Sequence, residues 1–174
     1  MSLLLDLTRF RGGAEQVDRR LDPGDFGPAR EDFRLAGPVH LKVEVRKDIK
    51  KVRLVGRLTA SMELDCGRCL EPYTIPVDTA LDLLFLPVTE QARETDLEVG
   101  DADVGVSYYT DDQIDLGEMM REQFYLALPM KPLCRDDCAG LCPICGINRN
   151  REQCQCQPSW VDPRLEPLRR LRSQ

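Results

Sequence analysis

The sequence predicts an α+β fold in which an antiparallel β-meander and one capped helix precede a cysteine-rich C-terminal segment. Three observations predict it. Apolar and polar residues alternate between positions 39 and 85, a helical pattern follows position 115, and six of the eight cysteines lie between positions 134 and 156. With 174 residues, 42% of them hydrophobic, the chain is long enough to bury a core without disulfide bonds.

The first 37 residues show little regular pattern. Residues 1–10 are predicted to form a short strand. Residues 11–37 contain five glycines. They are predicted to form an irregular connection with a helical or mobile part, because the stretch is long for a loop.

Three runs with a period of two predict the meander. The first run starts at Val39 and the second ends at Leu64, with a polar turn at residues 47–51 between them. A third run extends from Tyr73 to Phe85. Because alternate side chains of a strand point to opposite faces, these runs predict three antiparallel strands with one apolar face and one face in water.

A single capped helix is predicted after the meander. Residues 86–105 are expected to form a mobile acidic loop, and residues 106–109 another short strand. Asp115 has the character of an N-cap, Glu118 completes a capping-box pattern, and Pro129 ends the helix. The apolar residues between these signals recur at helical spacing: Leu116, Met119, Met120, Phe124 and Ala127.

The cysteines indicate metal binding rather than disulfides. The N-terminus has no basic region ahead of its leucines and Asp6 ends that apolar run, so no secretory signal is expected and the protein is predicted to be cytoplasmic. Thiols stay reduced in that compartment. The cysteines form CxxC, CxxxC, CxxC and CxC spacings: Cys66, Cys69, Cys134, Cys138, Cys142, Cys145, Cys154 and Cys156.

Eight thiols are enough for two closed zinc sites with four ligands each. The preferred partition assigns Cys142, Cys145, Cys154 and Cys156 to one ion, and Cys66, Cys69, Cys134 and Cys138 to the other. One compact site from residues 134, 138, 142 and 145 is the main alternative. An iron–sulfur cluster is less favoured because the CxxCxxC run of ferredoxins is absent, and buried thiols without metal are the simplest remaining interpretation.

The sequence predicts no enzyme. An all-thiolate site has no open position for water, so its zinc would be structural and not catalytic. The chain has one histidine, and it contains no P-loop, no Rossmann glycine pattern and no GxSxG motif.

The net charge of −6 averages two regions of opposite sign. From Lys42 to Arg57 there are seven basic and two acidic residues, whereas residues 90–122 contain eleven acidic and two basic residues. The acidic region would either solvate a loop or dock a basic partner such as a ribosomal protein. The outward basic residues of the first hairpin would either form a solvated face or contact RNA phosphates. The candidate RNA-binding residues are Lys42, Arg46, Arg53 and Arg57.

An ordered series of motifs resembles the bacterial YceD family, the large ribosomal RNA subunit accumulation proteins. The resemblance extends from about residue 38 to residue 171. The series comprises Cys66-x-x-Cys69-Leu70, Pro72-Tyr73, Ile114-Asp115-Leu116, Glu122, Leu126-Ala127-Leu128-Pro129, Leu133-Cys134, Gly140-Leu141-Cys142-Pro143-x-Cys145-Gly146-x-Asn148-x-Asn150, Cys154-x-Cys156 and Asp162-Pro163-Arg164-Leu165.

The resemblance implies a role in accumulating or processing large-subunit (23S) ribosomal RNA. We therefore expect a non-catalytic ribosome-assembly factor that contacts ribosomal RNA or its precursor and no membrane. The alternative is a chaperone or holding factor for a basic large-subunit ribosomal protein. We expect an α+β core domain at residues 1–133 and a zinc-binding segment at residues 134–174, whose C-terminal helix packs on the core.

Overall fold

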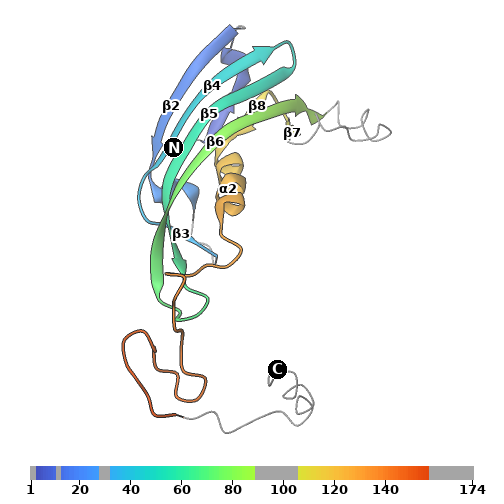
Figure 1. The fold of residues 1–174 in the computed structure, drawn as a ribbon. Coiled ribbons are helices and arrows are strands. Elements are labelled where there is room, and N and C mark those ends of the chain that lie inside the picture. The colour runs from blue at the N-terminus through green and yellow to red at the C-terminus, as the bar shows by residue number, and fades with distance from the viewer. Residues whose placement is uncertain (1–2, 11–12, 28–31, 89–105, 157–174) are drawn as a thin grey trace, which may run out of the picture. The chain divides into compact units, whose positions relative to one another are not determined.

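The computed structural model describes residues 3–10, 13–27, 32–88 and 106–156 (Figure 1). The chain divides into two compact units. The first unit comprises Met1–Leu64 and Tyr73–Met130, and the second comprises Asp65–Pro72 and Lys131–Gln174. All eight cysteines belong to the second unit. The connection between two long strands of the first unit is therefore part of the same unit as the C-terminal segment.

A six-stranded sheet forms the described part of the first unit, in the order β2-β4-β5-β6-β7, with β3 paired to β5 off this path. The predicted meander is confirmed as β4, β5 and β6. One pairing was not predicted, because β7 lies parallel to β6 and makes the sheet mixed. The strands are β2 (Gly13–Leu21), β3 (Arg34–Leu35), β4 (Val39–Asp48), β5 (Lys51–Asp65), β6 (Pro72–Pro87) and β7 (Val106–Tyr109).

The apolar face of the meander forms the core. Val39, Leu41, Val43 and Val45 are each at most 1% exposed, as their alternation predicts. The helix α2 (Leu116–Ala127) lies against this face of the sheet (Figure 1). The ring of its Phe124 lies 5.9 Å from the rings of both Phe26 and Phe33, in edge-to-face contacts.

The predicted N-cap and the predicted end of the helix are confirmed, and the reciprocal capping-box bond expected from Glu118 stays a prediction. Asp115 caps α2, because its carboxylate accepts hydrogen bonds from the backbone N–H groups of Gly117 and Glu118 at 2.8 and 3.0 Å. The helix ends at Ala127. Leu128 is extended, as expected for a residue before a proline. Asp115 also ends β8 (Gln113–Asp115), which pairs with β1 (Leu4–Asp6) in a small second sheet.

The predictions for the first 37 residues were wrong in two places. The expected strand at residues 1–10 covers only Leu4–Asp6 and continues into a 3-10 turn, η1 (Leu7–Arg9). The expected irregular connection contains the nine-residue strand β2 and a second 3-10 turn, η2 (Pro23–Phe26). Strand β2 lies at the edge of the sheet and is held by backbone pairing to β4, so it carries no apolar alternation.

Two expectations fall on residues outside the described part of the chain. They are the mobile loop, of which residues 89–105 are not described, and the C-terminal helix after residue 162. Of the residues the structure describes, no helix has the length and apolar character that crossing a membrane requires.

Strands β4 and β5 approach each other closely at Gly56. Gly56 pairs with Val43 in the antiparallel register. A Cβ atom at position 56 would lie 2.1 Å from the carbonyl oxygen of Lys42 and 2.6 Å from the Cα atom of Val43. Because these are backbone atoms of the central sheet, they cannot rotate away as a flexible side chain would. Glycine is therefore required here by space.

We expect Gly56→Ala to lower the free energy of unfolding by about 1–3 kcal/mol or more, since 1–3 kcal/mol is the usual effect of overpacking a core. The methyl group would force β4 and β5 apart. Chemical denaturation of the full-length protein measures the effect. Gly24→Ala is the matched control, because nothing lies within 4 Å of a Cβ atom at position 24. Equal stability of the two variants would contradict this account.

Candidate metal centres and charged surfaces

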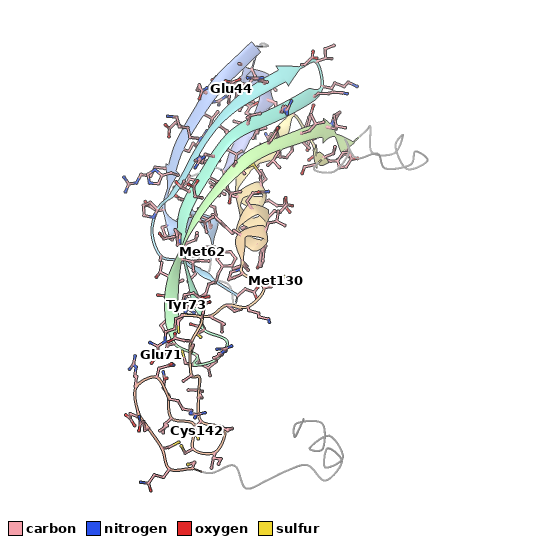
Figure 2. The ribbon with its side chains drawn as sticks, in the orientation of Figure 1. Glu44, Met62, Glu71, Tyr73, Met130 and Cys142 are labelled. Atoms are coloured by element: carbon pink, nitrogen blue, oxygen red, sulfur yellow. The ribbon has the colours of Figure 1, made fainter. Side chains whose placement is uncertain are left out.

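The eight cysteines form two groups of four. The first cluster is Cys66, Cys69, Cys134 and Cys138, and the second cluster is Cys142, Cys145, Cys154 and Cys156. Within each cluster all sulfur atoms lie within 4.8 Å of one another. This is the partition preferred from the sequence, and the alternative grouping of residues 134, 138, 142 and 145 is not formed. Figure 2 shows Cys142 in the loop of the second unit.

The spacing of the sulfur atoms fits a metal ion. In the first cluster, the Sγ atoms of Cys66 and Cys138 are 3.8 Å apart, as are those of Cys69 and Cys134. A tetrahedral ion with metal–sulfur bonds of about 2.3 Å holds its sulfur ligands about 3.8 Å from one another. The donor set and its spacing therefore suit a four-coordinate thiophilic ion such as Zn²⁺.

Both CxxC segments form the same tight turn. The N–H group of Leu70 donates to the carbonyl oxygen of Cys66, and that of Gly146 to the carbonyl oxygen of Cys142, both at 2.9 Å. The donor residue is left-handed in each turn, with φ of +59° at Leu70 and +75° at Gly146. The second turn has the glycine that this backbone favours, whereas the first forms despite a leucine that is 65% exposed.

Backbone N–H groups lower the pKa of the first cysteine in each CxxC turn. Burial raises the pKa of Cys66, but hydrogen bonds from the backbone N–H groups of Cys134, Cys69 and Arg68 lower it to about 6. Backbone N–H groups of Cys145 and Ile144 lower the pKa of Cys142 to about 6. Hydrogen bonds to the thiolate favour the charged form, which is the form that binds a metal ion.

Other thiols of the clusters retain their protons without a cation. Burial, followed by the neighbouring thiols, raises the pKa of Cys134 to about 12. The Cys145 sulfur raises the pKa of Cys156 to about 12. Four negative charges within 4.8 Å of one another repel strongly, so only part of each cluster ionises until a metal ion neutralises it.

The sheet brings the four candidate RNA-binding residues together. Lys42 and Arg46 lie on β4 and Arg53 and Arg57 on β5, where Lys42 pairs with Arg57 and Arg46 with Arg53. All four alternate with the buried residues and therefore point away from the core. The register places them on the same face of the sheet as Glu44, which is labelled in Figure 2.

Carboxylates on neighbouring positions pair with three of these four cations. Arg53 makes two hydrogen bonds to Asp82 at 2.6 Å, and Arg57 contacts Asp78 at 2.7 Å. Arg46 pairs with Glu44. Within the described residues, Lys42 makes no ion pair. The sequence count of seven basic and two acidic residues missed this neutralisation, because Asp78 and Asp82 come from β6.

A second charged surface is acidic. Asp115, Glu118 and Glu122 line a hollow of about 280 Å³ whose apolar wall includes Phe85 and Met119. Asp115 caps α2, and Glu118 and Glu122 lie on the helix at positions spaced three and four residues apart, so they share one face of it. This part of the acidic region predicted at residues 90–122 therefore belongs to ordered structure, while residues 90–105 lie outside the described residues.

Comparison with known proteins identifies relatives. The family model described as "Large ribosomal RNA subunit accumulation protein YceD" matches residues 54–172. An uncharacterized protein of Mycobacterium tuberculosis is 36% identical over 74% of this chain and 59% of its own length. The maize protein named "Large ribosomal RNA subunit accumulation protein YCED homolog 1, chloroplastic" is 27% identical over 91% of this chain and 63% of its own length.

A further relative has a similar length. The uncharacterized protein YlbN of Bacillus subtilis is 26% identical over 91% of this chain and 88% of its own length. The mycobacterial and maize relatives are longer, and this chain spans less than two thirds of each. No solved structure matches the chain.

We expect metal binding to release protons and to strengthen as the pH rises. The pKa is raised for Cys69 and Cys134 in the first cluster and for Cys154 and Cys156 in the second, so these thiols are protonated at neutral pH. A metal ion must displace those protons, which compete with it more strongly at low pH.

Titration of metal-free protein with Zn²⁺ in weak buffer at pH 7, followed with a pH indicator, measures the release. At least two protons should be released for each ion bound, and the affinity in chelator competition should increase between pH 6 and pH 8. A pH-independent affinity would show that the thiols are already ionised.

Proposed function

The chain belongs to the YceD family of large ribosomal RNA subunit accumulation proteins, and from this premise we propose that it supports the accumulation or processing of large-subunit ribosomal RNA as a non-catalytic assembly factor. Family membership carries the first part of this proposal. The direct contact with RNA and the absence of catalysis are our interpretation of the surfaces and cysteine clusters. The site of action is proposed to be the cytoplasm.

The outward face of β4 and β5 is the proposed RNA contact. Lys42, Arg46 and Arg57 surround a shallow hollow of about 440 Å³ on this face. Their ion pairs do not prevent binding. Both partners of the Arg57–Asp78 pair are exposed, and in the Arg46–Glu44 pair the arginine is exposed and the glutamate partly buried. Exposed pairs contribute about 0–1 kcal/mol. An RNA phosphate can therefore replace a carboxylate as the partner of an arginine at little cost. The paired carboxylates would limit non-specific attraction.

Zinc is the proposed ion in both clusters, with a structural role. Zn²⁺ accepts four thiolates in a closed tetrahedron and undergoes no redox change. A site closed by four cysteines has no position for a reactive water molecule, which supports a role in folding the second unit. The cysteine-rich loops contain few apolar residues, so metal binding would provide most of their folding free energy.

The alternative function is to hold a basic large-subunit ribosomal protein. The hollow lined by Asp115, Glu118 and Glu122 favours it, because acidic side chains beside apolar Phe85 and Met119 complement a segment rich in Lys and Arg. We rank it second because the family is named for RNA accumulation. Crosslinking in cells, with identification of the attached RNA and protein, distinguishes the two functions.

We expect the protein, purified without chelators, to contain two zinc ions, and we expect chelation to unfold residues 134–156 first. A structural zinc ion contributes roughly 10–16 kcal/mol in small zinc-binding peptides. Elemental analysis gives the zinc content, and hydrogen exchange before and after chelation gives the protection of this segment and of β4 and β5. Protein that contains no zinc would contradict the proposal, as would unchanged exchange at residues 134–156.

We expect substitution of the arginines and substitution of the aspartates in these ion pairs to change RNA affinity in opposite directions. Arg53→Ala with Arg57→Ala should weaken binding to precursor ribosomal RNA and reduce the slope of log affinity against log salt by about one for each phosphate that is no longer neutralised. Asp78→Asn with Asp82→Asn should strengthen binding, because each substitution frees an arginine. Filter binding across a salt series measures both.

A charge-matched control separates this face from net charge. Glu118→Gln with Glu122→Gln removes two negative charges, as the two aspartate substitutions do, but beside the acidic hollow on α2. It should leave RNA affinity nearly unchanged. If it raises the affinity as much as Asp78→Asn with Asp82→Asn, the outward sheet face is not the contact.

A further inference from the structure

The side chain of Asn150 uses all of its hydrogen-bonding capacity. Its amide nitrogen donates to the sulfur of Cys138 at 3.3 Å and to the side-chain oxygen of Asn148 at 2.8 Å. Its amide oxygen accepts from the backbone N–H of Ala139 at 2.8 Å and from the guanidinium of Arg135 at 2.7 Å. An asparagine side chain has two donor hydrogens and two acceptor positions, so none remains free.

These partners determine which way the amide points. The N–H of Ala139 and the guanidinium of Arg135 can only donate, so the atom that faces them must be the oxygen of Asn150. The nitrogen must then face Cys138, where it meets a sulfur that accepts hydrogen bonds most strongly as a thiolate. Asn150 is therefore arranged to stabilise negative charge on a ligand of the first cluster.

Asn150 itself belongs to the loop of the second cluster. It lies between Cys145 and Cys154 in the sequence. Its turn is closed by the N–H groups of Arg151 and Glu152, which both donate to the carbonyl oxygen of Asn148 at 3.0 Å. A metal ion at the second cluster ties both ends of this loop and so reduces its freedom to move.

Backbone hydrogen bonds join the same loop to the first CxxC turn. The N–H of Arg149 donates to the carbonyl oxygen of Gly140 at 2.9 Å, and the N–H of Leu141 donates to that of Arg68 at 3.1 Å. The guanidinium of Arg68 in turn donates to the carbonyl oxygen of Cys138 at 2.9 Å. The loop of one cluster thus packs on the ligands of the other, with Asn150 making the direct contact to sulfur.

We propose that Asn150 is a positioning residue that couples the two clusters, so that a metal ion bound at the second cluster strengthens metal binding at the first. The proposal depends on the metal binding proposed above and adds a link between the sites. A metal-ordered second loop presents the Asn150 amide to Cys138 without further loss of conformational freedom. By thermodynamic reciprocity, an ion at the first cluster strengthens binding at the second by the same factor.

Substitutions at Asn150 test the contact. Asn150→Ala removes the donor and should weaken metal binding at the first cluster by about 10- to 100-fold, the usual effect of losing a hydrogen bond to a metal ligand. Asn150→Asp should weaken it further, because a carboxylate oxygen would then face both the Cys138 thiolate and the Asn148 oxygen. Gln153→Glu adds the same charge to an exposed position of the same loop and is the matched control.

Cys154→Ser with Cys156→Ser tests the coupling. This variant leaves the first cluster as the remaining four-thiol site, so Co²⁺ titration with chelator competition reports its affinity directly. In the wild-type protein, ¹¹³Cd NMR during chelator competition resolves the two sites. We expect the first cluster to lose affinity by a similar 10- to 100-fold when the second cluster is removed. Asn150→Ala added to that variant should have little further effect.

A spectroscopic readout distinguishes positioning from general stability. Loss of the hydrogen bond to Cys138 should shift the sulfur-to-cobalt charge-transfer band of the first cluster in Asn150→Ala, and Gln153→Glu should leave the band unchanged. Unchanged first-cluster affinity in both Asn150→Ala and the double serine variant overturns the coupling while leaving two metal sites in place. Protein that binds neither Co²⁺ nor Cd²⁺ overturns the metal proposal itself.

Discussion

Repulsion among thiolates is the constraint on which the second unit depends. Each cluster gathers four sulfur atoms within 4.8 Å, and no basic side chain donates to them within the described residues. Hydrogen bonds from backbone N–H groups lower the pKa of Cys66 and Cys142, and those from Asn150 and the backbone N–H of Gly140 lower the pKa of Cys138. These hydrogen bonds do not compensate four negative charges in either cluster. A divalent cation would remove this repulsion, because it would form a strong bond to each of the four thiolates.

The first unit is stabilised by its apolar core and its strand pairing and does not depend on thiolates. Its sheet buries one apolar face under α2 and leaves the other face to paired charges, so burial and backbone pairing are sufficient for its fold. Because like charges lie opposite each other on β4 and β5, the carboxylates of β6 are needed to stabilise the outward face. The arginines proposed to contact RNA therefore also take part in the ion pairs that stabilise this face of the sheet.

The sequence predicted the features that leave a local signature. Period-two alternation predicted β4 to β6, the cap at Asp115 predicted α2, and ligand spacing predicted the partition of the cysteines. It did not predict β2, whose edge position requires no apolar pattern. Nor did it predict the pairing of Arg53 and Arg57 with Asp82 and Asp78, or the contact of Asn150 with Cys138. These pairs are far apart in the chain and meet only in the folded structure.

The position of the first cluster in the chain has a consequence for the stability of the sheet. Cys69 and Cys134 are 65 positions apart, and β6, β7, β8 and α2 all lie between them. A metal ion shared by these two residues closes that stretch into a loop, as a disulfide would, and removes conformational entropy from the unfolded chain. For a disulfide, a loop of this length corresponds to about 4 kcal/mol. A metal ion held in the second unit would thus stabilise the first through the connectivity of the chain.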